Sequence, residues 1–337
     1  MLVEAGFRWI PFSFSRRGLN PVAELATVLR LAKIYRRERP DLVHHFTIKC
    51  VLYGSLASRM AGIRGVANSV PGLGHVFADD GWRMRMIRPV IKRIYKHALR
   101  GTQVIFQNPD DRREFIEQKL TDDANHHLIM GSGVDVSRFR PGPRPSNDSR
   151  KVVLFASRLL WSKGVREYVE AAAIVRKAIP TARLLIAGEP DAGNPDAVSV
   201  DKLHRLAAQG DVELLGHREH MEELLGSVNV VVLPSYYREG TPRILVEAAS
   251  CGLPLVATDA PGCREIVRHG LNGLLVPAKD PQALAEAIKT LLRDEQLCAT
   301  MGGRSRQIAC DEFSEESVIE RTLTVYEQAI AGSPARK

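Results

Sequence analysis

The sequence predicts an α/β protein with two doubly wound domains, each built on a parallel sheet. Apolar runs of strand length alternate with helical patterns throughout the chain, and 337 residues exceed what one core usually supports. The stretch RFRPGPRPSNDSRK, residues 138–151, is rich in Pro, Gly and Arg and has no apolar periodicity. We therefore expect a first domain over residues 1–143, a second over 150–312 and a C-terminal helix over 313–331.

The expected strands follow from runs of apolar and β-branched residues. In the first domain they are RWIPFSF (8–14), DLVHHF (41–46), GVANSV (65–70), QVIFQ (103–107) and HLIM (127–130). In the second domain they are VVLFA (152–156), RLLIAG (183–188), VELLG (212–216), NVVVLPS (229–235), PLVATD (254–259) and GLLVP (273–277).

The start of the chain departs from the usual order of a doubly wound domain. MLVEAG, residues 1–6, has the pattern of a helix end with its C-terminal glycine, and it leads straight into a strand. Such a domain normally opens with a strand and a tight glycine turn. We expect a first domain that is incomplete at its N-terminus, and favour a truncated start over completion of the sheet by another chain.

Composition excludes several classes of protein. Hydrophobic residues make up 45% and charged residues 26% of the sequence, and no apolar run approaches the roughly 18 residues that span a bilayer. The first residues do not read as a secretory leader. The five cysteines are scattered and never spaced as CxxC, so neither disulfides nor a zinc site is expected. A cytoplasmic protein without a bound metal is the expectation.

Positive charge is concentrated in the first half. Residues 1–150 carry 25 Lys and Arg against 14 Asp and Glu, and residues 151–337 carry 22 against 25. The densest part, residues 82–100, places Val90, Ile91, Ile94 and Ala98 on one helix face beside basic residues. Such a helix can lie on an anionic membrane, or it can be a core helix with a solvated face. Nucleic acid ranks lower because no recognised module accompanies the charge.

Two glutamates stand in the apolar stretch REGTPRILVEAASCG, residues 238–252. Glu239 follows a buried strand, where ligands bind in open α/β sheets. Thr241 reads as the cap and Pro242 as the first residue of a helix that carries Glu247 about 7.5 Å along its axis. Backbone N–H groups at Gly240 and Thr241 would attract a phosphate. A solvated pair of charges is the alternative, but apolar neighbours of Glu247 count against it.

A second polar cluster follows the strand at 152–156. In SRLLWSKG, residues 157–164, Arg158 and Lys163 flank a turn before the next helix. Two cations at a strand's carboxyl end can neutralise a leaving diphosphate in place of a metal. Loop cations are usually only solvated, so the cluster gains weight mainly from sharing a sheet edge with the glutamates.

These stretches, together with LPSYYREGTPRILVEAASCGLPLVATDAPGCREIV and NGLLVP, resemble the C-terminal half of glycosyltransferase family 4. The stretches RERPDLVHHFTIKCVLYGSLASRMAGI, VIFQNPDDRREF and GSGVDVSRF extend the resemblance over nearly the whole chain. They are most similar to the branch that acts on undecaprenyl-diphosphate-linked glycans. The resemblance implies the GT-B fold, two Rossmann-like domains across a cleft, with the last helix crossing back to the first domain.

The resemblance also implies roles for single residues. The position of Glu247 would bind the ribose of a nucleotide sugar, and that of Glu239 hydroxyls of the donor sugar. The positions of Gly240 and Thr241 would hold the distal phosphate, and Gly216 and His217 would lie near the base. Arg158 and Lys163 would hold the diphosphate, so that no metal is required.

The function implied is a retaining transferase, peripheral on the inner face of the plasma membrane. It would move a hexose or N-acetylhexosamine from a UDP-sugar to a lipid-linked or polysaccharide acceptor in O-antigen, capsule or other envelope glycan synthesis. Two alternatives stay open. One is a catalytically inactive protein that binds nucleotide sugar or membrane, and the other is a sugar-nucleotide epimerase of the same fold.

Overall fold

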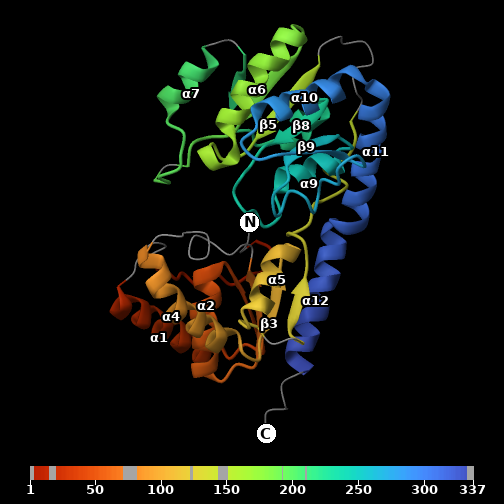
Figure 1. Cartoon of the computed structure of the whole chain (residues 1–337). Helices are drawn as coiled ribbons and strands as arrows, with labels where there is room; N and C mark the ends of the chain where they lie inside the picture. The colour runs from red at the N-terminus through yellow and green to blue at the C-terminus, as the bar shows by residue number, and fades with distance from the viewer. Residues whose placement is uncertain are drawn as a thin grey trace.

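Two parallel sheets, one in each half of the chain, form the framework of the computed structural model (Figure 1). The structure describes residues 4–14, 20–70, 82–121, 124–142, 151–191, 193–208 and 211–331. The first sheet has the order β1-β2-β3-β4 and the second the order β10-β9-β8-β5-β6-β7. All pairings are parallel, which confirms the predicted fold class of two α/β domains.

The first half alternates helices and strands in chain order. Its elements are α1 (Pro21–Glu38), β1 (Leu42–Phe46), α2 (Ile48–Ala61), β2 (Gly65–Val70), α4 (Trp82–Leu99), β3 (Gln103–Phe106), α5 (Pro109–Glu117) and β4 (His126–Leu128).

The second half continues the alternation and ends in three helices. Its elements are β5 (Val152–Ala156), η1 (Trp161–Lys163), α6 (Val165–Ala178), β6 (Arg183–Ala187), α7 (Val200–Ala207), β7 (Glu213–Gly216), α8 (Met221–Gly226), β8 (Val230–Leu233), α9 (Arg243–Ser250), β9 (Leu255–Thr258), β10 (Gly273–Val276), α10 (Pro281–Arg293), α11 (Glu295–Glu312) and α12 (Glu315–Ala331).

The second sheet has the strand order of a doubly wound dinucleotide-binding fold. The chain starts at the central strand β5, moves outward through β6 to β7, and returns to β8 on the other side of β5 before continuing to β10. The direction of winding therefore reverses between β5 and β8. In such sheets the crevice at this reversal, outside the carboxyl ends of the strands, is where ligands bind.

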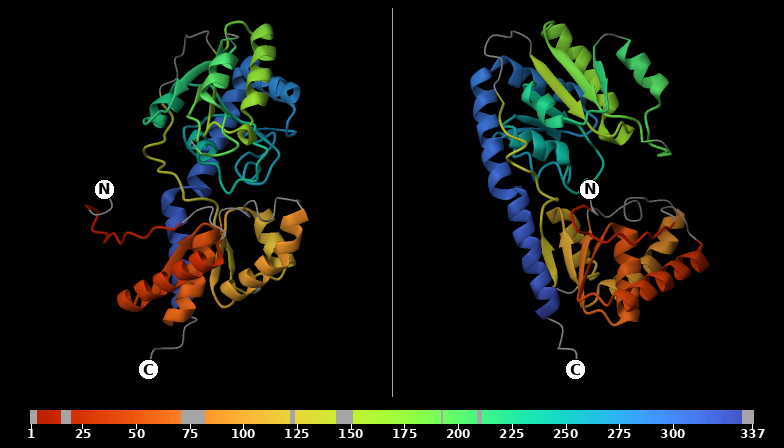
Figure 2. Two further views of the ribbon diagram at one scale, coloured as in Figure 1. Left: turned by 90° about the vertical axis from the view of Figure 1, so that its left-hand side faces the viewer. Right: turned by 180° about the vertical axis from the view of Figure 1, so that it is seen from behind.

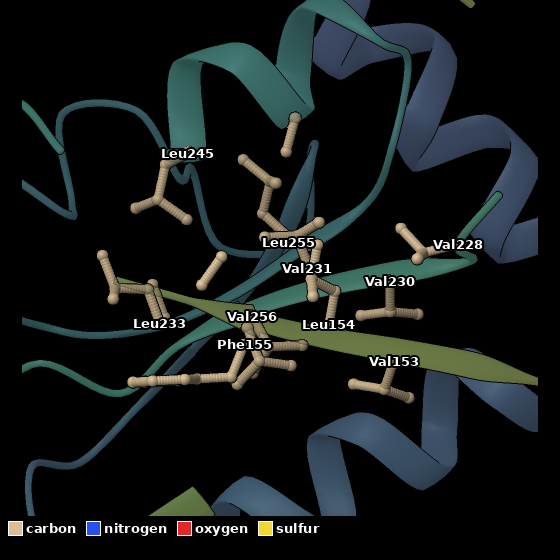
Figure 3. Packing of buried hydrophobic residues seen from close by; sticks show 14 of the residues in the cluster. Val153, Leu154, Phe155, Val228, Val230, Val231, Leu233, Leu245, Leu255 and Val256 are labelled. Atoms are coloured by element: carbon tan, nitrogen blue, oxygen red, sulfur yellow. The ribbon is translucent and has the colours of Figure 1, made fainter. Parts of the chain in front are cut away.

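One continuous core holds the second domain together. Helices α6 and α10 pack together, and α9 packs against α11. Figure 3 shows Leu245 of α9 pointing toward the strands that carry Val231 and Leu255, both fully buried. Strands buried on both faces are expected to be nearly continuous runs of Val, Leu and Ile, which is the pattern of β5 and β8.

The expected strand over residues 8–14 is wrong. This segment is irregular and lies along α1, where Arg8 pairs with Glu38 and the guanidinium of Arg30 stands 5.2 Å from the centre of the Phe12 ring. Pro11 has no N–H to donate to a ladder, and the aromatic side chains contact helices instead. Within the described residues, β1 is therefore an edge strand. Residues 4–6 form a turn, and residues 1–3 of the expected helix end lie outside the described residues.

Helix α4 confirms a helix within residues 82–100, and its predicted apolar face is covered only in part. Tyr95, Ala98 and Leu99 are buried, whereas Val90 is 59% and Ile94 41% exposed. The buried residues follow the three- and four-residue spacing of one face, and Val90 and Ile94 fall outside it. The side chains of residues 82–85 and 87 lie outside the described part of the chain.

The C-terminal helix joins the two halves. Figures 1 and 2 show α11 and α12 running along one side of the molecule, from the second sheet to the first. Val318 and Val325 of α12 pack against Ile105 and Ile129 next to the first sheet. At the start of α12, Glu315 N donates to Val134 O at 3.0 Å, so the two segments that connect the domains lie side by side. The domain limits drawn from the sequence remain a proposal.

Candidate active site at the switch point of the second sheet

A cavity opens at the carboxyl edge of the second sheet, where the winding reverses. Its volume is about 520 Å³. Residues after β5, β6, β7 and part of α9 line it, and the polar side chains among them are Ser157, Arg158, Glu189, Asp191, His217, Arg218, Arg243 and Glu247. The cavity thus presents three arginines, which can bind an anionic ligand, and three carboxylates, which can accept hydrogen bonds from hydroxyl groups.

Arg158 and Glu247 face this cavity in different states of exposure. Arg158 is 63% exposed, and its Nη1 lies 2.7 Å from Oδ2 of Asp191. Glu247 is only 14% exposed, and its Oε1 accepts a hydrogen bond from Nε of Arg243 at 3.2 Å. An exposed ion pair is held weakly in water, so Arg158 can exchange Asp191 for a ligand phosphate at small cost.

Glu239 and Lys163 form a pair beside the cavity. Nζ of Lys163 donates to Oε1 of Glu239, and the hydroxyl of Ser235 donates to the same oxygen at 2.9 Å. Both charged side chains are nearly buried, at 12% for Lys163 and 13% for Glu239. Such a pair holds each partner in one place, because either charge alone would be costly in that position.

The remaining predicted residues lie along the same edge. Gly216 ends β7, and its carbonyl accepts a hydrogen bond from Gly188 N at 2.9 Å, while the next residue, His217, lines the cavity. Thr241 lines a small cleft shared with Glu247, and its hydroxyl donates to Gln107 O at 3.4 Å. Gly240 lies between Glu239 and Thr241 in the loop before α9.

The start of α9 differs from the prediction by one residue. Pro242 is the N-cap rather than the first helical residue, and Thr241 does not cap the helix. The hydroxyl of Thr241 donates instead to Gln107 of the first domain, so this side chain serves the contact between domains.

Five of the eight predicted residues form two groups, and Gly216, Gly240 and Thr241 belong to neither. Arg158, His217 and Glu247 share the large cavity, while Lys163 and Glu239 pair with each other next to it. These assignments remain predictions as to role.

Sequence reasoning missed Asp191, which pairs with Arg158, and Arg243, which holds Glu247. Asp191 follows strand β6 in the run AGEPD, so its place after a strand was available as a signal. Gly188 in that run has φ +129°, and a Cβ there would stand 1.9 Å from Ser157 O. Only glycine lets the ends of β5 and β6 approach so closely.

The surroundings of Glu239 are packed and partly desolvated. Burial raises the pKa of Tyr237, and the charge of Glu239 adds to that effect. Burial likewise raises the pKa of Glu265, which accepts a hydrogen bond from Gly262 N at 2.6 Å. A Cβ on Gly262 would stand 2.6 Å from both Cβ and O of Glu239, so this glycine is needed for the loop to close on the glutamate.

Two properties of the described residues complete the site. Among them, no group of three or more His, Cys, Asp and Glu side chains is arranged to hold a metal ion. None of the helices that the structure describes is both long and apolar enough to cross a bilayer.

Comparisons with known proteins identify the family. A family model described as glycosyl transferases group 1 matches residues 138–308, and one described as glycosyl transferase 4-like matches residues 2–108. A relative from Campylobacter jejuni is 30% identical over 98% of this chain and 88% of its own length. It is named N,N'-diacetylbacillosaminyl-diphospho-undecaprenol alpha-1,3-N-acetylgalactosaminyltransferase.

A second relative, from Escherichia coli, is named UDP-Gal:alpha-D-GlcNAc-diphosphoundecaprenol alpha-1,3-galactosyltransferase. It is 24% identical over 92% of this chain and 81% of its own length. Among solved structures, Anabaena HepE in complex with UDP superposes with a TM-score of 0.76 at 22% identity, covering 91% of this chain and 84% of that one. Sucrose-phosphate synthase from Thermosynechococcus elongatus gives 0.77 at 22% identity, covering 96% and 82%. The chain therefore belongs to the group 1, family 4-like glycosyltransferases and has their two-domain GT-B fold.

Proposed function

We propose that this glycosyltransferase moves a sugar from a UDP-sugar to an acceptor linked to a lipid diphosphate, with retention of the anomeric configuration. The observation that carries the proposal is the cavity at the switch point, which Arg158, His217 and Glu247 all line. The Campylobacter and Escherichia coli relatives are named for undecaprenol-linked acceptors, and HepE was solved with UDP, which supports both substrate classes.

The cavity would take the nucleotide part of the donor. Glu247 is held by Arg243 with its second oxygen left to accept hydrogen bonds from the ribose hydroxyls. His217, after β7, would lie at the base. Arg158 would leave Asp191 for the diphosphate, and the exposure of that ion pair makes the exchange inexpensive.

The Lys163–Glu239 pair would serve the reacting end of the donor. In the proposed step, the acceptor hydroxyl oxygen bonds to the anomeric carbon on the face from which the diphosphate departs. The bond from that carbon to the phosphate oxygen breaks, and the hydroxyl proton passes to the leaving phosphate. Negative charge grows on the diphosphate, and Arg158 and Lys163 would stabilise it without a metal. Glu239 would accept hydrogen bonds from sugar hydroxyls.

We further propose that the donor sugar is a hexose or N-acetylhexosamine. The names of the two relatives specify N-acetylgalactosamine and galactose, respectively. The product would then enter cell-envelope glycan synthesis, such as O-antigen or capsule.

The first domain would rest on the inner face of the plasma membrane through α4. Met86, Val90 and Ile94 recur every four residues and are 75%, 59% and 41% exposed. Arg93 and Lys96 are exposed beside them. An apolar stripe flanked by cations suits the interface of an anionic bilayer better than bulk water.

A donor screen tests the transferase proposal. Purified full chain is incubated with UDP-glucose, UDP-galactose and their N-acetylated forms, with and without bacterial lipid-diphosphate-linked glycans, and UDP release is followed. We expect release with at least one donor, stimulated by acceptor and lowered about 100-fold by Glu239→Gln. Glu286→Gln, an exposed glutamate on α10, is the control. UDP binding without turnover of any donor would favour the inactive binder, and interconversion of the sugar nucleotides would favour the epimerase.

Vesicle sedimentation tests the membrane proposal. The full chain should bind vesicles containing phosphatidylglycerol and bind vesicles of phosphatidylcholine alone weakly. The double variant Val90→Ser, Ile94→Ser should bind vesicles more weakly, because it removes apolar surface that the bilayer would bury. Both side chains are exposed in the structure, so their loss should not disturb the core. Equal sedimentation of the double variant and the unchanged chain would contradict a role for α4.

A further inference from the structure

The loop that carries Glu239 is held from both domains. Its own domain holds the Glu239 side chain through Lys163 and Ser235. The preceding residue, Arg238, points the other way, to α5 of the first domain. Its Nη2 donates to Oδ1 of Asp111 and its Nη1 to Oε2 of Glu114, each at 3.0 Å.

Asn108 adds a backbone contact at the same place. Its Nδ2 donates to Glu239 O at 3.1 Å and to Oδ2 of Asp111 at 2.8 Å. Its Oδ1 accepts from Asp111 N at 2.8 Å, which caps α5. Asn108 and Asp111 are fully buried. The first domain thus binds the backbone of Glu239 through Asn108 and the side chain of Arg238 through Asp111 and Glu114.

The chemistry of this contact favours a single geometry. Arg238 is 37% exposed and Glu114 26%, so the pair is shielded more than an ordinary surface ion pair. A planar guanidinium that binds two carboxylates fixes direction as well as distance. Burial raises the pKa of Asp111, and the Arg238 charge opposes that rise. Removing the cation would leave the buried carboxyl group of Asp111 with its hydrogen bond from Asn108 but without an opposite charge.

We propose that Arg238 is a positioning residue, which together with Asn108, Asp111 and Glu114 forms an interdomain clamp that sets the place of Glu239 in the sugar half of the site. The inference rests on the proposed function for the role of Glu239, whereas the clamp itself is a structural claim. The nucleotide half of the site lies outside it, because Arg158, His217 and Glu247 come from the second domain alone.

This division predicts separate effects on binding and turnover. Arg238→Ala should leave UDP affinity within about threefold and lower kcat with the UDP-sugar 10- to 100-fold, since misplacing a positioned group by about 1 Å costs about that much. Arg238→Lys keeps one charge contact and should fall between Arg and Ala. In a chain that already carries Arg238→Ala, the further change Glu114→Ala should lower kcat little more, because the two residues act through one contact.

Hydrogen exchange gives a readout that does not need activity. In Arg238→Ala, amides of residues 235–241 should exchange about tenfold faster, because a charge-assisted contact has been lost. Arg268→Ala is the matched control: Arg268 pairs with Glu312 at 2.6 Å and is 40% exposed, but the pair lies within the second domain. The control should change neither the exchange of 235–241 nor turnover.

The outcomes separate the two proposals. Unchanged exchange at 235–241 in Arg238→Ala would overturn the clamp, whatever the activity. If the unchanged chain turns over no UDP-sugar while the exchange result holds, the proposed function fails and the clamp stands. Equal loss of UDP affinity and turnover would show general damage rather than positioning, and would also overturn the inference. Should Arg238→Ala not fold, Arg238→Lys and Glu114→Gln test the same contacts with smaller changes.

Discussion

The two domains bury their sheets in different ways. The second domain has one large apolar cluster that runs through β5, β6, β8 and β9 and the helices on both faces. The first domain divides its buried apolar residues among several smaller clusters, and it also buries polar side chains such as His45 and Asn68. His45, for example, has its Nε2 2.9 Å from the Tyr35 hydroxyl and its Nδ1 2.8 Å from Oδ1 of Asn68.

The difference agrees with the separate roles that the two domains have in the proposed reaction. A continuous core gives a rigid platform, and the residues that line the nucleotide cavity all stand on it. The first domain exposes apolar side chains on its outer helices, such as Leu25 of α1 and Val90 of α4, and grips the second through α5. In the proposed function, it would meet a bilayer on one side and position the loop that carries Glu239 on the other.

The largest expected effect compares the cores directly. Leu154 of β5 and Leu99 of α4 are both fully buried leucines. Leu154→Ala should lower the free energy of unfolding by about 4 kcal/mol, and Leu99→Ala by about 3 kcal/mol, because the smaller cluster can relax further into the cavity. Urea unfolding followed by circular dichroism measures both. A larger loss of unfolding free energy for Leu99→Ala than for Leu154→Ala would contradict the contrast drawn between the two cores.

A somewhat smaller effect is expected from the buried ion pair of the second domain. Lys163→Met leaves Glu239 charged and nearly buried, and should destabilise the chain by about 3 kcal/mol. Lys163→Met combined with Glu239→Leu should recover most of the stability without activity. Thermal unfolding of the single and double variants checks this, and a double variant no more stable than the single one would argue against a desolvated pair.

The polar contacts of the first domain predict a dependence on pH. His44 links Ser69 of β2 at 2.7 Å to Tyr326 of α12 at 2.6 Å. Burial, aided by the charge of His45, lowers the pKa of His44 to about 4. In the unfolded chain His44 takes up its proton near pH 6.5, whereas in the folded chain it does so only near pH 4. The contribution of neutral His44 to the free energy of unfolding is therefore complete above pH 6.5 and is lost as the pH falls toward 4.

Between pH 7 and 5 the loss should be about 1–2 kcal/mol from this residue. His44→Gln should flatten the fall in unfolding free energy over that range, although His45, whose pKa burial also lowers, should keep some of it. Urea titrations at the two pH values measure the effect. An equally steep fall in His44→Gln would assign it to other groups.

The smallest change in stability is expected at the exposed pair of the site. Arg158→Ala removes a contact to Asp191 that is 63% exposed on the arginine side, and should alter the unfolding free energy by less than about 0.5 kcal/mol. Thermal unfolding without ligand measures this. A loss as large as that of Lys163→Met would mean that Arg158 is structural rather than free to move to a phosphate.

Much of the fold could be predicted because the strands carry their own signal. Runs such as VVLFA and NVVVLPS are apolar on both faces, which identifies buried parallel strands without further information. The segment at 8–14 misled because its aromatic residues also suit a strand, and only contact with α1 and α2 decides their place. Whether α4 meets a membrane or packs in the core stayed open, because spacing fixes a helix face but not whether neighbours cover it, and the structure leaves Val90 and Ile94 exposed.

The site residues that lie at strand ends could be predicted from the sequence. Contacts between residues that are far apart in the sequence could not. Arg158 and Glu239 follow β5 and β8, and those strands are neighbours once the sheet forms. Arg238, in the same loop as Glu239, was not predicted as a site residue. Its partners Asp111 and Glu114 lie more than one hundred residues earlier, and no local pattern links them.

The central claim is that the nucleotide lies in the cavity at the switch point, with Glu247 accepting its ribose hydroxyls. Calorimetric titration of UDP into the unchanged chain and into Glu247→Ala tests it most directly, with Glu286→Ala as control. We expect the Glu247 variant to bind UDP at least about tenfold more weakly and the control to bind as the unchanged chain does. Equal affinity in all three proteins would contradict the account.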